Sequence, residues 1–306
     1  LIAYQTAYLK NYHKEDFIAA TMSTELSNTD KLREFVQELR RLKIEIVRPS
    51  INKCFADFKA EKNKIYYALS GIKSVGYEAI SQIVEERKKN GDFKSLEDFI
   101  KRVKPKSINK LQLEGLVKAG AFDELNKNRA SLYDFIPKMI QINKSSWEEK
   151  NSLQTNLFEK NNDKSFDNIK IPKIKDWTKN EILMNEFLSI GFYMSDHPLK
   201  TYENYLKQFK ITSFEDFKNS EENNGVIAGT IMSIQEKKSI KGNPFAIIKF
   251  SDLKTEFELF LFSDLLIQKR NFLKPSNSFA LTLQKDSFSN GSNIKRINIK
   301  NIIELN

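Results

Sequence analysis

The sequence predicts a multi-domain protein of mixed α and β structure. Its 306 residues are enough for two or three domains of ordinary size. Apolar residues recur at helical spacing through the first half of the chain, and they alternate with polar residues through the last third. Hydrophobic residues make up 40% and charged residues 29%, which is typical of a globular protein and not of a disordered one.

Composition also narrows the class of protein. No apolar run approaches the roughly 20 residues of a membrane-spanning helix, which argues against an integral membrane protein. The single cysteine, Cys54, excludes an internal disulfide framework and a thiolate zinc cluster, and it fits the reducing cytoplasm. Only His13 and His197 are present, far apart in sequence, which argues against a histidine-rich metal centre.

The net charge of +10, from 50 Lys+Arg and 40 Asp+Glu, points to a polyanionic partner. Most of the basic residues are lysines, and Asn and Ile are abundant too, a bias that an AT-rich genome produces without selection for binding. The net charge alone therefore does not show that the partner is a nucleic acid. The chain starts at Leu1 in the middle of an apolar phrase, and we expect it to be a piece of a longer protein.

Residues 1–43 predict helices. From the capping residues Asn28-Thr29-Asp30 onward, apolar residues recur at helical spacing, beginning with Leu32. The pattern changes at Arg48-Pro49-Ser50. Residues 55–61 and 64–69, separated by a polar Lys-Asn turn, predict a short strand pair.

Residues 71–140 predict a run of short helices with tight joints. The first spans 77–89 and ends at Gly91, where a helix C-cap is expected. Ser95 to Asp98 resembles a capping box that opens the second helix. The third and fourth are expected over 107–118 and 128–142. Residues 143–177 are rich in Asn, Lys, Ser and Asp and predict an exposed linker, followed by a helical region over 180–188 and a turn at 196–198.

The last part alternates apolar and polar residues in five segments, which predict strands. They span 226–235, 245–250, 257–262, 279–285 and 294–303, with a helix-compatible stretch, 263–272, between the third and fourth. Five strands with a helix in that place are the order of an OB-fold β-barrel.

The first candidate site is Gly71-Ile72-Lys73-Ser74-Val75-Gly76, directly before a helix. Two glycines at this spacing let the backbone form a tight turn with outward N–H groups. The amides of Ser74 and Gly76 and the helix N-terminus suit a phosphate oxygen, and Lys73 adds a positive charge. This is the helix-hairpin-helix arrangement, which holds the DNA backbone and reads no bases. An ordinary interhelical turn is the alternative. A second hairpin over 117–122 is degenerate, and structural packing is favoured there.

The second candidate site lies in the polar linker, at Gln154, Leu157 and Phe158. Adjacent large apolar residues in a solvated segment are costly unless a partner buries them. A Gln followed by a Leu-Phe pair is typical of a short linear motif that docks in a pocket. A local anchor onto the neighbouring domain is the alternative.

The third candidate site is the loop between the first two predicted barrel strands, with Lys237, Lys238 and Lys241 followed by Phe245. Lysines beside an aromatic residue suit the backbone and bases of a single strand. The alternative is a solvated lysine loop on a barrel that docks another protein.

Signals for catalysis are absent. The sequence has no phosphate-binding loop, no dinucleotide fingerprint, no nucleophile elbow and no close pair of strand-borne aspartates. Cys54 is expected to be a packed thiol, and Asp196-His197 a turn. We therefore expect no catalytic residue, metal ligand or cofactor in this chain.

Eight phrases occur in a fixed order along the chain: Tyr4–Lys10, Phe17–Ala20, Asn28–Lys31, Pro49–Asn52, Tyr67–Gly76, Gly120–Asp123, Gly191–Pro198 and Phe257–Phe262. In this order, these phrases resemble the bacterial DNA polymerase III alpha subunit family, the C-family replicative polymerases. The resemblance covers essentially the whole chain.

The resemblance implies a C-terminal portion that starts within the fingers domain. Residues 1–65 would end the fingers, 66–142 would form a tandem helix-hairpin-helix domain, 143–178 a linker with a clamp-binding peptide, 179–222 a helical connector and 223–306 the OB-fold domain. The implied partners are primer-template DNA, the sliding clamp (beta subunit) and other polymerase III holoenzyme subunits. The palm of such a polymerase, whose aspartates bind Mg²⁺, would lie upstream, so this chain is expected to be inactive alone.

Two other functions remain open from the residues. One is a stand-alone, non-catalytic adaptor of DNA repair or recombination. The other is an RNA-binding barrel protein. Competition between ribo- and deoxy-oligonucleotides separates the second from a DNA-binding protein.

Overall fold

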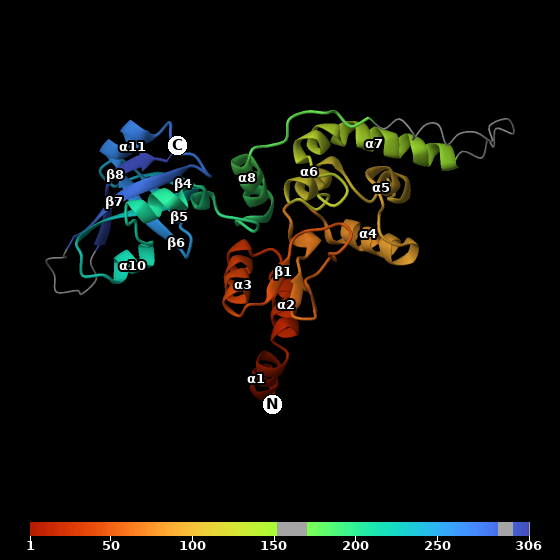
Figure 1. The fold of residues 1–306 in the computed structure, drawn as a ribbon, viewed down its shortest axis with the longest axis horizontal. Coiled ribbons are helices and arrows are strands. Elements are labelled where there is room, and N and C mark those ends of the chain that lie inside the picture. The colour runs from red at the N-terminus through yellow and green to blue at the C-terminus, as the bar shows by residue number, and fades with distance from the viewer. Residues whose placement is uncertain (152–169, 287–295, 306) are drawn as a thin grey trace. The chain divides into compact units, whose positions relative to one another are not determined.

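The structure is a computed structural model, and it describes residues 1–151, 170–286 and 296–305. The chain divides into two compact units, Leu1–Ser195 and Asp196–Asn306. The first is mostly helical and the second is built on a β-sheet (Figure 1). The predicted mixture of α and β structure is therefore confirmed.

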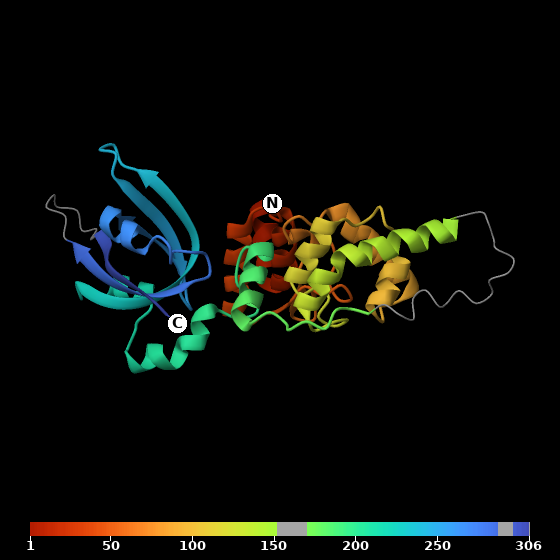
Figure 2. The same ribbon diagram turned by 90° about the horizontal axis from the view of Figure 1, so that it is seen from above.

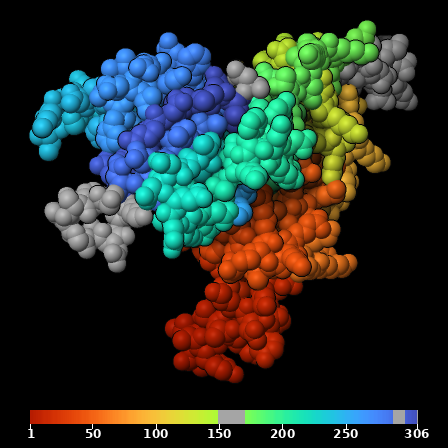
Figure 3. All heavy atoms as spheres, turned by 60° about the vertical axis from the view of Figure 1, so that its left-hand side comes forward, coloured from red at the N-terminus to blue at the C-terminus, as the bar shows by residue number. Residues whose placement is uncertain are grey.

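The predicted N-terminal helices are present as α1 (Ile2–Tyr12), α2 (Lys14–Thr24) and α3 (Thr29–Arg41). The side chain of Asn28 accepts a hydrogen bond from the backbone N–H of Lys31, as expected of an N-cap. Helix α3 buries its apolar stripe, whereas α1 buries no residue, and its side chains lie at the surface (Figure 3).

A small three-stranded sheet follows. Strands β2 (Lys59–Glu61) and β3 (Lys64–Tyr66) pair antiparallel, as predicted, but they are shorter than expected. A third strand, β1 (Glu45–Val47), pairs parallel to β3 and was not predicted. Its three residues are too few to show an alternation in sequence, and its pairing depends on a partner distant along the chain.

The helical run predicted over 71–140 is confirmed, with shifted ends. It begins with a 3₁₀ turn, η1 (Leu69–Gly71), and contains α4 (Tyr77–Asn90), α5 (Leu96–Arg102), α6 (Lys110–Lys118) and α7 (Arg129–Asn151). Ser95 caps α5, but Asp98 accepts from Lys94 N–H and not from Ser95. The reciprocal capping box occurs instead at Asn109 and Gln112, so α6 begins three residues later than expected.

Helix α7 extends through Asn151, into the segment that the sequence predicts as exposed linker. Asn143, the first residue of that segment, is buried, and its side-chain amide donates to the carbonyl oxygens of Ile100 (2.6 Å) and Val103 (2.8 Å). Both donors of the amide are used, so this polar residue is buried at little cost. The expectation that an exposed linker begins at residue 143 is therefore wrong for Asn143, and residues 143–151 are the last turns of a helix.

At the other end of that segment, residues 170–178 have no regular structure, yet they lie against the first unit. Ile171 and Trp177 pack on its core, and Asn128 donates to the carbonyl oxygen of Ile174 (2.8 Å). Helix α8 (Lys179–Ile190) follows, with a capping box between Thr178 and Glu181. The polar composition of this stretch therefore does not make all of it a solvated linker.

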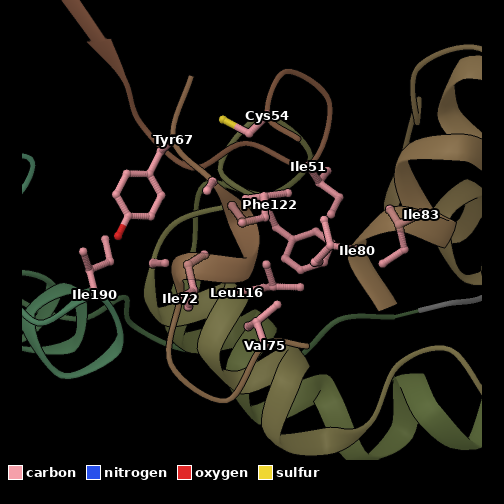
Figure 4. Close-up of a cluster of buried hydrophobic side chains, with 14 of the residues drawn as sticks. Ile51, Cys54, Tyr67, Ile72, Val75, Ile80, Ile83, Leu116, Phe122 and Ile190 are labelled. Atoms are coloured by element: carbon pink, nitrogen blue, oxygen red, sulfur yellow. The ribbon is translucent and has the colours of Figure 1, made fainter. Parts of the chain in front are cut away.

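One hydrophobic core joins helices α2 to α8 and the small sheet of the first unit. Figure 4 shows Ile72 and Val75, from the segment before α4, beside Leu116 of α6. Burial of each such side chain contributes about 1.5–3 kcal/mol. The backbone between η1 and α4 is therefore anchored by its own apolar residues.

The second unit holds the five predicted strands. They are β4 (Asn224–Lys238), β5 (Pro244–Ser251), β6 (Glu256–Phe262), β7 (Ser278–Asp286) and β8 (Arg296–Glu304). The sheet order is β6-β5-β4-β7-β8 with every pair antiparallel, and the predicted helix, α11 (Ser263–Lys269), lies between the third and fourth strands. The sheet curls towards a barrel, as the view from above in Figure 2 shows, without a ladder between its edge strands β6 and β8 in the described residues.

Short helical elements precede the sheet: the 3₁₀ helix η3 (Pro198–Tyr202), α9 (Glu203–Gln208) and α10 (Phe214–Asn219). The long strand β4 bends at a register shift between Ile231 and Ser233. At Gly229, a Cβ would lie 3.1 Å from Phe250, so the missing side chain lets the curved sheet close over its aromatic core.

Candidate nucleic-acid interface

The predicted hairpin lies between η1 and α4, and its turn differs from the expectation. Neither Gly71 nor Gly76 has a positive φ; the left-handed residue is Ser74, with φ of 67°. The expectation that the two glycines supply the backbone freedom of the turn is therefore wrong. This region costs a residue with a Cβ about 1–2 kcal/mol, because the Cβ approaches the following carbonyl oxygen.

Gly71 and Gly76 are needed because other side chains pack closely against their Cα atoms, which leaves little room for a Cβ. A Cβ on Gly71 would lie 3.3 Å from Leu26, and one on Gly76 would lie 3.1 Å from the side-chain amide of Gln112. A third glycine, Gly115 in α6, was not singled out from the sequence. A Cβ there would lie 2.9 Å from the carbonyl oxygen of Lys73, so Gly115 lets α6 pack directly on the hairpin backbone. Its signal was a glycine inside a helical pattern, which usually has a packing reason.

The hairpin amides divide into bonded and open groups. Lys73 N–H donates to the carbonyl oxygen of Ser189 (2.8 Å), and Val75 N–H donates to that of Ile72 (3.0 Å). Within the described parts of the chain, Ser74 N–H and Gly76 N–H have no acceptor. Gly76 is also the N-cap of α4, so these two amides lie beside the positive end of a 14-residue helix.

The side chains around these amides carry both signs of charge. Lys73 and Ser74 are exposed. Tyr77, the first residue of α4, donates its hydroxyl to the carboxylate of Asp57 (2.7 Å), and this hydrogen bond raises the pKa of Tyr77. The Asp57 carboxylate therefore opposes an anion at the helix start, while Lys73 and the open amides favour one.

In the second hairpin, the backbone amides are used in internal hydrogen bonds. Gly120 N–H and Ala121 N–H donate to Val117 (3.0 Å) and Leu116 (2.9 Å), and Gly120 takes the left-handed conformation, with φ of 80°. Beside them the buried Arg129 guanidinium would collide with any Cβ on Gly120. This geometry favours structural packing over a phosphate contact.

Arg129 is held by two carboxylates. It donates to Asp123 (2.6 Å) and to Glu186 of α8 (3.1 Å), and Glu186 also accepts from the hydroxyl of Ser195 (2.6 Å). Burial lowers the pKa of Arg129, but the hydrogen bonds and charges of Asp123 and Glu186 outweigh it and raise that pKa. The network joins the second hairpin to α8, which in turn holds the first hairpin through Ser189.

In the second unit, the three lysines of the third candidate site do not share one loop. Lys237 and Lys238 are the last residues of β4, and only Lys241 lies in the connection to β5. Lys237 pairs with Phe245, so these two side chains share one face of the sheet, and Lys238 points to the other face. Of the three lysines expected near Phe245, the strand pairing thus places only Lys237 on the same face, while Lys241 is exposed in the connection.

That face carries an aromatic strip. Phe245 pairs with Phe262, and Phe260 and Phe262 are 39% and 46% exposed. The ring of Phe260 lies 6.3 Å from that of Phe245 and 6.5 Å from that of Phe262. The guanidinium of Arg296 lies 5.1 Å from the Phe262 ring and 5.8 Å from the Phe260 ring.

The aromatic strip was missed in the sequence, although a signal was present. Residues 259–262 are apolar without a break, while a half-exposed strand needs only every second residue to be apolar. Leu259 and Leu261 are buried, so Phe260 and Phe262 are left outside. Exposed phenylalanines beside a guanidinium form a surface on which a planar, negatively charged ligand can stack.

Cys54 and His197, for which the sequence predicts structural roles, make local packing and hydrogen-bond contacts in the structure. Burial raises the pKa of the Cys54 thiol to about 11, and its Sγ lies 3.3 Å from the carbonyl oxygen of Arg48. His197 caps η3 by accepting from Leu199 N–H, and its Nε2 lies 2.8 Å from Ser251 Oγ. Across the described ranges, no group of three or more His, Cys, Asp or Glu is placed to hold a metal ion.

Gln154, Leu157 and Phe158 lie outside the described residues, so the second candidate site stays a prediction from the sequence. Among the helices that the structure describes, none is long and apolar enough to cross a bilayer.

Comparisons with known proteins fit this geometry. Residues 43–132 match the family model described as a helix-hairpin-helix motif. The chain is 34% identical over 299 residues to the DNA polymerase III subunit alpha of Borreliella burgdorferi. This alignment covers 94% of this chain and 26% of that protein. It is 32% identical to the same subunit of Caulobacter vibrioides (92% and 25%) and 30% identical to that of Campylobacter jejuni (90% and 24%).

The chain thus spans about a quarter of the length of these relatives. The resemblance that the sequence indicated is confirmed over nearly the whole chain.

Proposed function

Because nearly the whole of this chain is similar to part of bacterial DNA polymerase III alpha subunits, we propose that it is the DNA-holding part of such a replicative polymerase. It would hold primer-template DNA and tether the polymerase to its sliding clamp during chromosomal replication. The observation that carries the proposal is the hairpin before α4, with two open amides and an exposed lysine at a helix N-terminus.

The hairpin would hold the duplex by its phosphates. A phosphate oxygen accepts from Ser74 N–H and Gly76 N–H, and Lys73 supplies a point charge beside it. These contacts carry no base information, which suits a polymerase that must hold every sequence equally. The proposal is supported by the anchoring of Ile72 and Val75 in the core, since a rigid loop loses little entropy on binding.

The test is duplex binding by this chain at increasing salt. Affinity should fall steeply, because each phosphate contact releases condensed counterions. Lys73→Ala should weaken binding and lower the salt slope by about one. Lys62→Ala, an exposed lysine in the turn between β2 and β3, is the control. A flat salt response, or equal effects of the two changes, would contradict the hairpin contact.

We propose that the second unit is an OB-fold domain which holds the single-stranded template. The strand order, in which the first strand lies between the second and the fourth, and the position of α11 support this fold. Bases would stack on Phe245, Phe260 and Phe262, while Lys237 and Arg296 approach the phosphates. Lys241 would contribute from the β4–β5 connection, and Lys238 from the opposite face.

We propose that Gln154, Leu157 and Phe158 bind the sliding clamp. The support is the sequence alone: an apolar pair in a polar segment that follows the helix-hairpin-helix domain and precedes the OB-fold domain along the chain, as the family resemblance implies. A tether of this kind raises the local concentration of polymerase at primer ends, so that weak DNA contacts suffice.

The clamp proposal is tested by a pull-down with the host's clamp. Leu157→Ala with Phe158→Ala should abolish capture and leave DNA affinity unchanged. Asn161→Ala with Asn162→Ala, in the same segment, is the matched control. If the clamp still captures the Leu157→Ala, Phe158→Ala variant, these residues are not the clamp-binding motif.

The longer polymerase would transfer nucleotides with two Mg²⁺ ions. The described residues offer no carboxylate cluster that fits those ions, so no catalytic step is assigned to them. We expect this chain alone not to extend primers, to work with other polymerase III holoenzyme subunits, and to act in the cytoplasm, where the Cys54 thiol stays reduced.

Competition between ligands separates this proposal from its alternatives. Primed DNA should displace a ribo-oligonucleotide of the same sequence. A preference for RNA would favour the RNA-binding protein, and DNA binding without clamp capture would favour a repair adaptor.

A further inference from the structure

The first unit contains a cavity of about 520 Å³ that is separate from both hairpins in sequence. It lies between the α5–α6 connection and the second half of α7, and its lining residues are Lys104, Pro105, Lys106, Lys144, Trp147 and Glu148. Three of these six side chains are lysines and one is a tryptophan. This combination is not needed to close the core, because the cavity opens to the surface.

One wall is a fixed turn. Ser107 N–H donates to the carbonyl oxygen of Lys104 (3.0 Å), which closes a β-turn with Pro105 at its second position. The hydroxyl of Ser107 is hydrogen bonded to Gln82 of α4. The turn is thus held at both its backbone and its side chain, and Lys104 and Lys106 flank the proline.

The opposite wall is one face of α7. Lys144, Trp147 and Glu148 are three and four residues apart, so they lie on the same side of the helix. One turn before Trp147, the buried amide of Asn143 bonds to the carbonyl oxygens of Ile100 and Val103, which ties this part of α7 to the end of α5. Figure 2 shows α7 and α5 side by side. The separation of the two walls is therefore set by buried hydrogen bonds.

The charge of the cavity favours an anion. Lys104, Lys106 and Lys144 are exposed, and none of them forms an ion pair with a described residue. Among the lining residues that the structure describes, Glu148 is the only acid, so these six residues carry a net charge of +2, from three lysines and one glutamate. The half-buried indole of Trp147 offers an apolar, planar surface beside these charges.

We propose that this cavity binds one nucleotide of a single-stranded nucleic acid, with the base stacked on Trp147 and the flanking phosphates beside Lys104, Lys106 and Lys144. Base stacking on an aromatic side chain combined with lysine–phosphate contacts is the chemistry of sequence-tolerant single-strand binding. The inference rests on the proposed function only for the class of ligand. The site itself is a second contact, on the helical unit, additional to the phosphate-holding hairpin.

Trp147 is also the probe. The chain has two tryptophans, and Trp177 packs on Tyr133, with ring centroids 5.6 Å apart. In a Trp177→Phe background, oligothymidylate should quench the remaining emission, because a stacked base quenches an indole. Lys104→Ala, Lys106→Ala and Lys144→Ala together should raise the half-quenching concentration about tenfold or more. Trp147→Leu should weaken binding of a labelled oligothymidylate by about fivefold or more, and Trp147→Phe should restore most of the loss.

The control removes the same charge elsewhere. Lys10, Lys14 and Lys62 are exposed lysines in the first unit, outside the cavity. Their combined change to alanine should shift the half-quenching concentration less than threefold, an effect of net charge alone. Equal effects of the two triple variants would overturn the proposal, as would full quenching in the cavity variant. Circular dichroism of each variant confirms that the helices persist.

Two further ligands discriminate the chemistry. Polyphosphate has the charge without the base and should compete weakly without quenching. Polyglutamate should neither compete with oligothymidylate nor quench Trp147. Quenching by polyglutamate but not by oligothymidylate would assign the cavity to an acidic peptide and overturn the proposal.

The hairpin test is separate. Loss of duplex binding in Lys73→Ala with unchanged Trp147 quenching supports both sites, whereas absent quenching with intact duplex binding overturns only the cavity.

Discussion

A Cβ built on Gly115 would lie 2.9 Å from the carbonyl oxygen of Lys73, closer than real side chains approach a backbone oxygen. Helix α6 thus packs directly against the backbone of the proposed phosphate-holding hairpin, which is possible because Gly115 has no side chain. The same residue costs α6 about 1 kcal/mol in helix propensity relative to alanine. The close contact is the physical reason for glycine there.

Gly115→Ala should lower the free energy of unfolding by about 1–2 kcal/mol, because overpacking outweighs the gain in helix propensity. The hairpin backbone must also move, so duplex affinity should fall. Chemical denaturation and duplex titration measure the two effects. Leu111→Ala, an exposed change on the same helix, should alter neither. A Gly115→Ala variant that is more stable and binds normally would contradict the packing.

Gly76→Pro tests the open amide. Gly76 has φ of −80°, close to the value that proline imposes, so the change removes the N–H with little change in backbone angle. Duplex affinity should fall by about tenfold to a hundredfold, because a hydrogen bond to a charged group contributes about 1.5–3 kcal/mol. Gly76→Ala is the matched control, since it adds a Cβ beside the flexible Gln112 but keeps the N–H. Equal binding by the two variants would show that the amide makes no phosphate contact.

Asp57→Asn should strengthen duplex binding about twofold to threefold at low salt, because it removes a negative charge beside the start of α4. The gain should disappear at high salt. A gain that is independent of salt would point to a change in shape and not in charge.

The Tyr77–Asp57 hydrogen bond has its own pH dependence. The pKa of Tyr77 is raised above its ordinary value of 10.0 by this bond, so the contribution to stability is fully present below pH 10 and is lost as the pH rises through the raised pKa. Absorbance titration of Tyr77 in Asp57→Asn should show its pKa shifted back down. An unchanged tyrosine titration would mean that the bond is not formed in solution.

Phe260→Ala with Phe262→Ala should weaken single-strand binding by the second unit by at least tenfold, since each stacked base is worth about 1–3 kcal/mol. Duplex binding should stay near the wild-type value. Fluorescence anisotropy with a labelled single strand measures the change. Phe209→Ala, an equally apolar exposed residue of the same unit, is the control and should have no effect. If Phe209→Ala is equally damaging, the aromatic strip has no special role.

The structure also shows how far local sequence patterns extend. The five strands, the helix between the third and fourth, and the helices of the first unit follow from periodicity, because the spacing of apolar residues reports which face is buried. Strand β1 was missed, since three residues contain too little pattern and its pairing with β3 is non-local.

The candidate sites show the same division. The hairpin segment could be recognised from sequence, but which residue takes the left-handed turn could not, because Ser74 is held there by Ile72 and Val75 in the core. The face of Lys237 and Lys238 depends on a register shift inside β4, which reverses every side chain after it.

By itself, the sequence determined the order and type of most elements, the family resemblance and the position of the first hairpin, all of which depend on residues close together in the chain. Only the tertiary structure decided that the amides of Ser74 and Gly76 stay open, that Asn143 is buried, and that Trp147 faces Lys104 across a cavity. Those relations join residues far apart in the chain, and packing and hydrogen bonding, rather than local preference, set them.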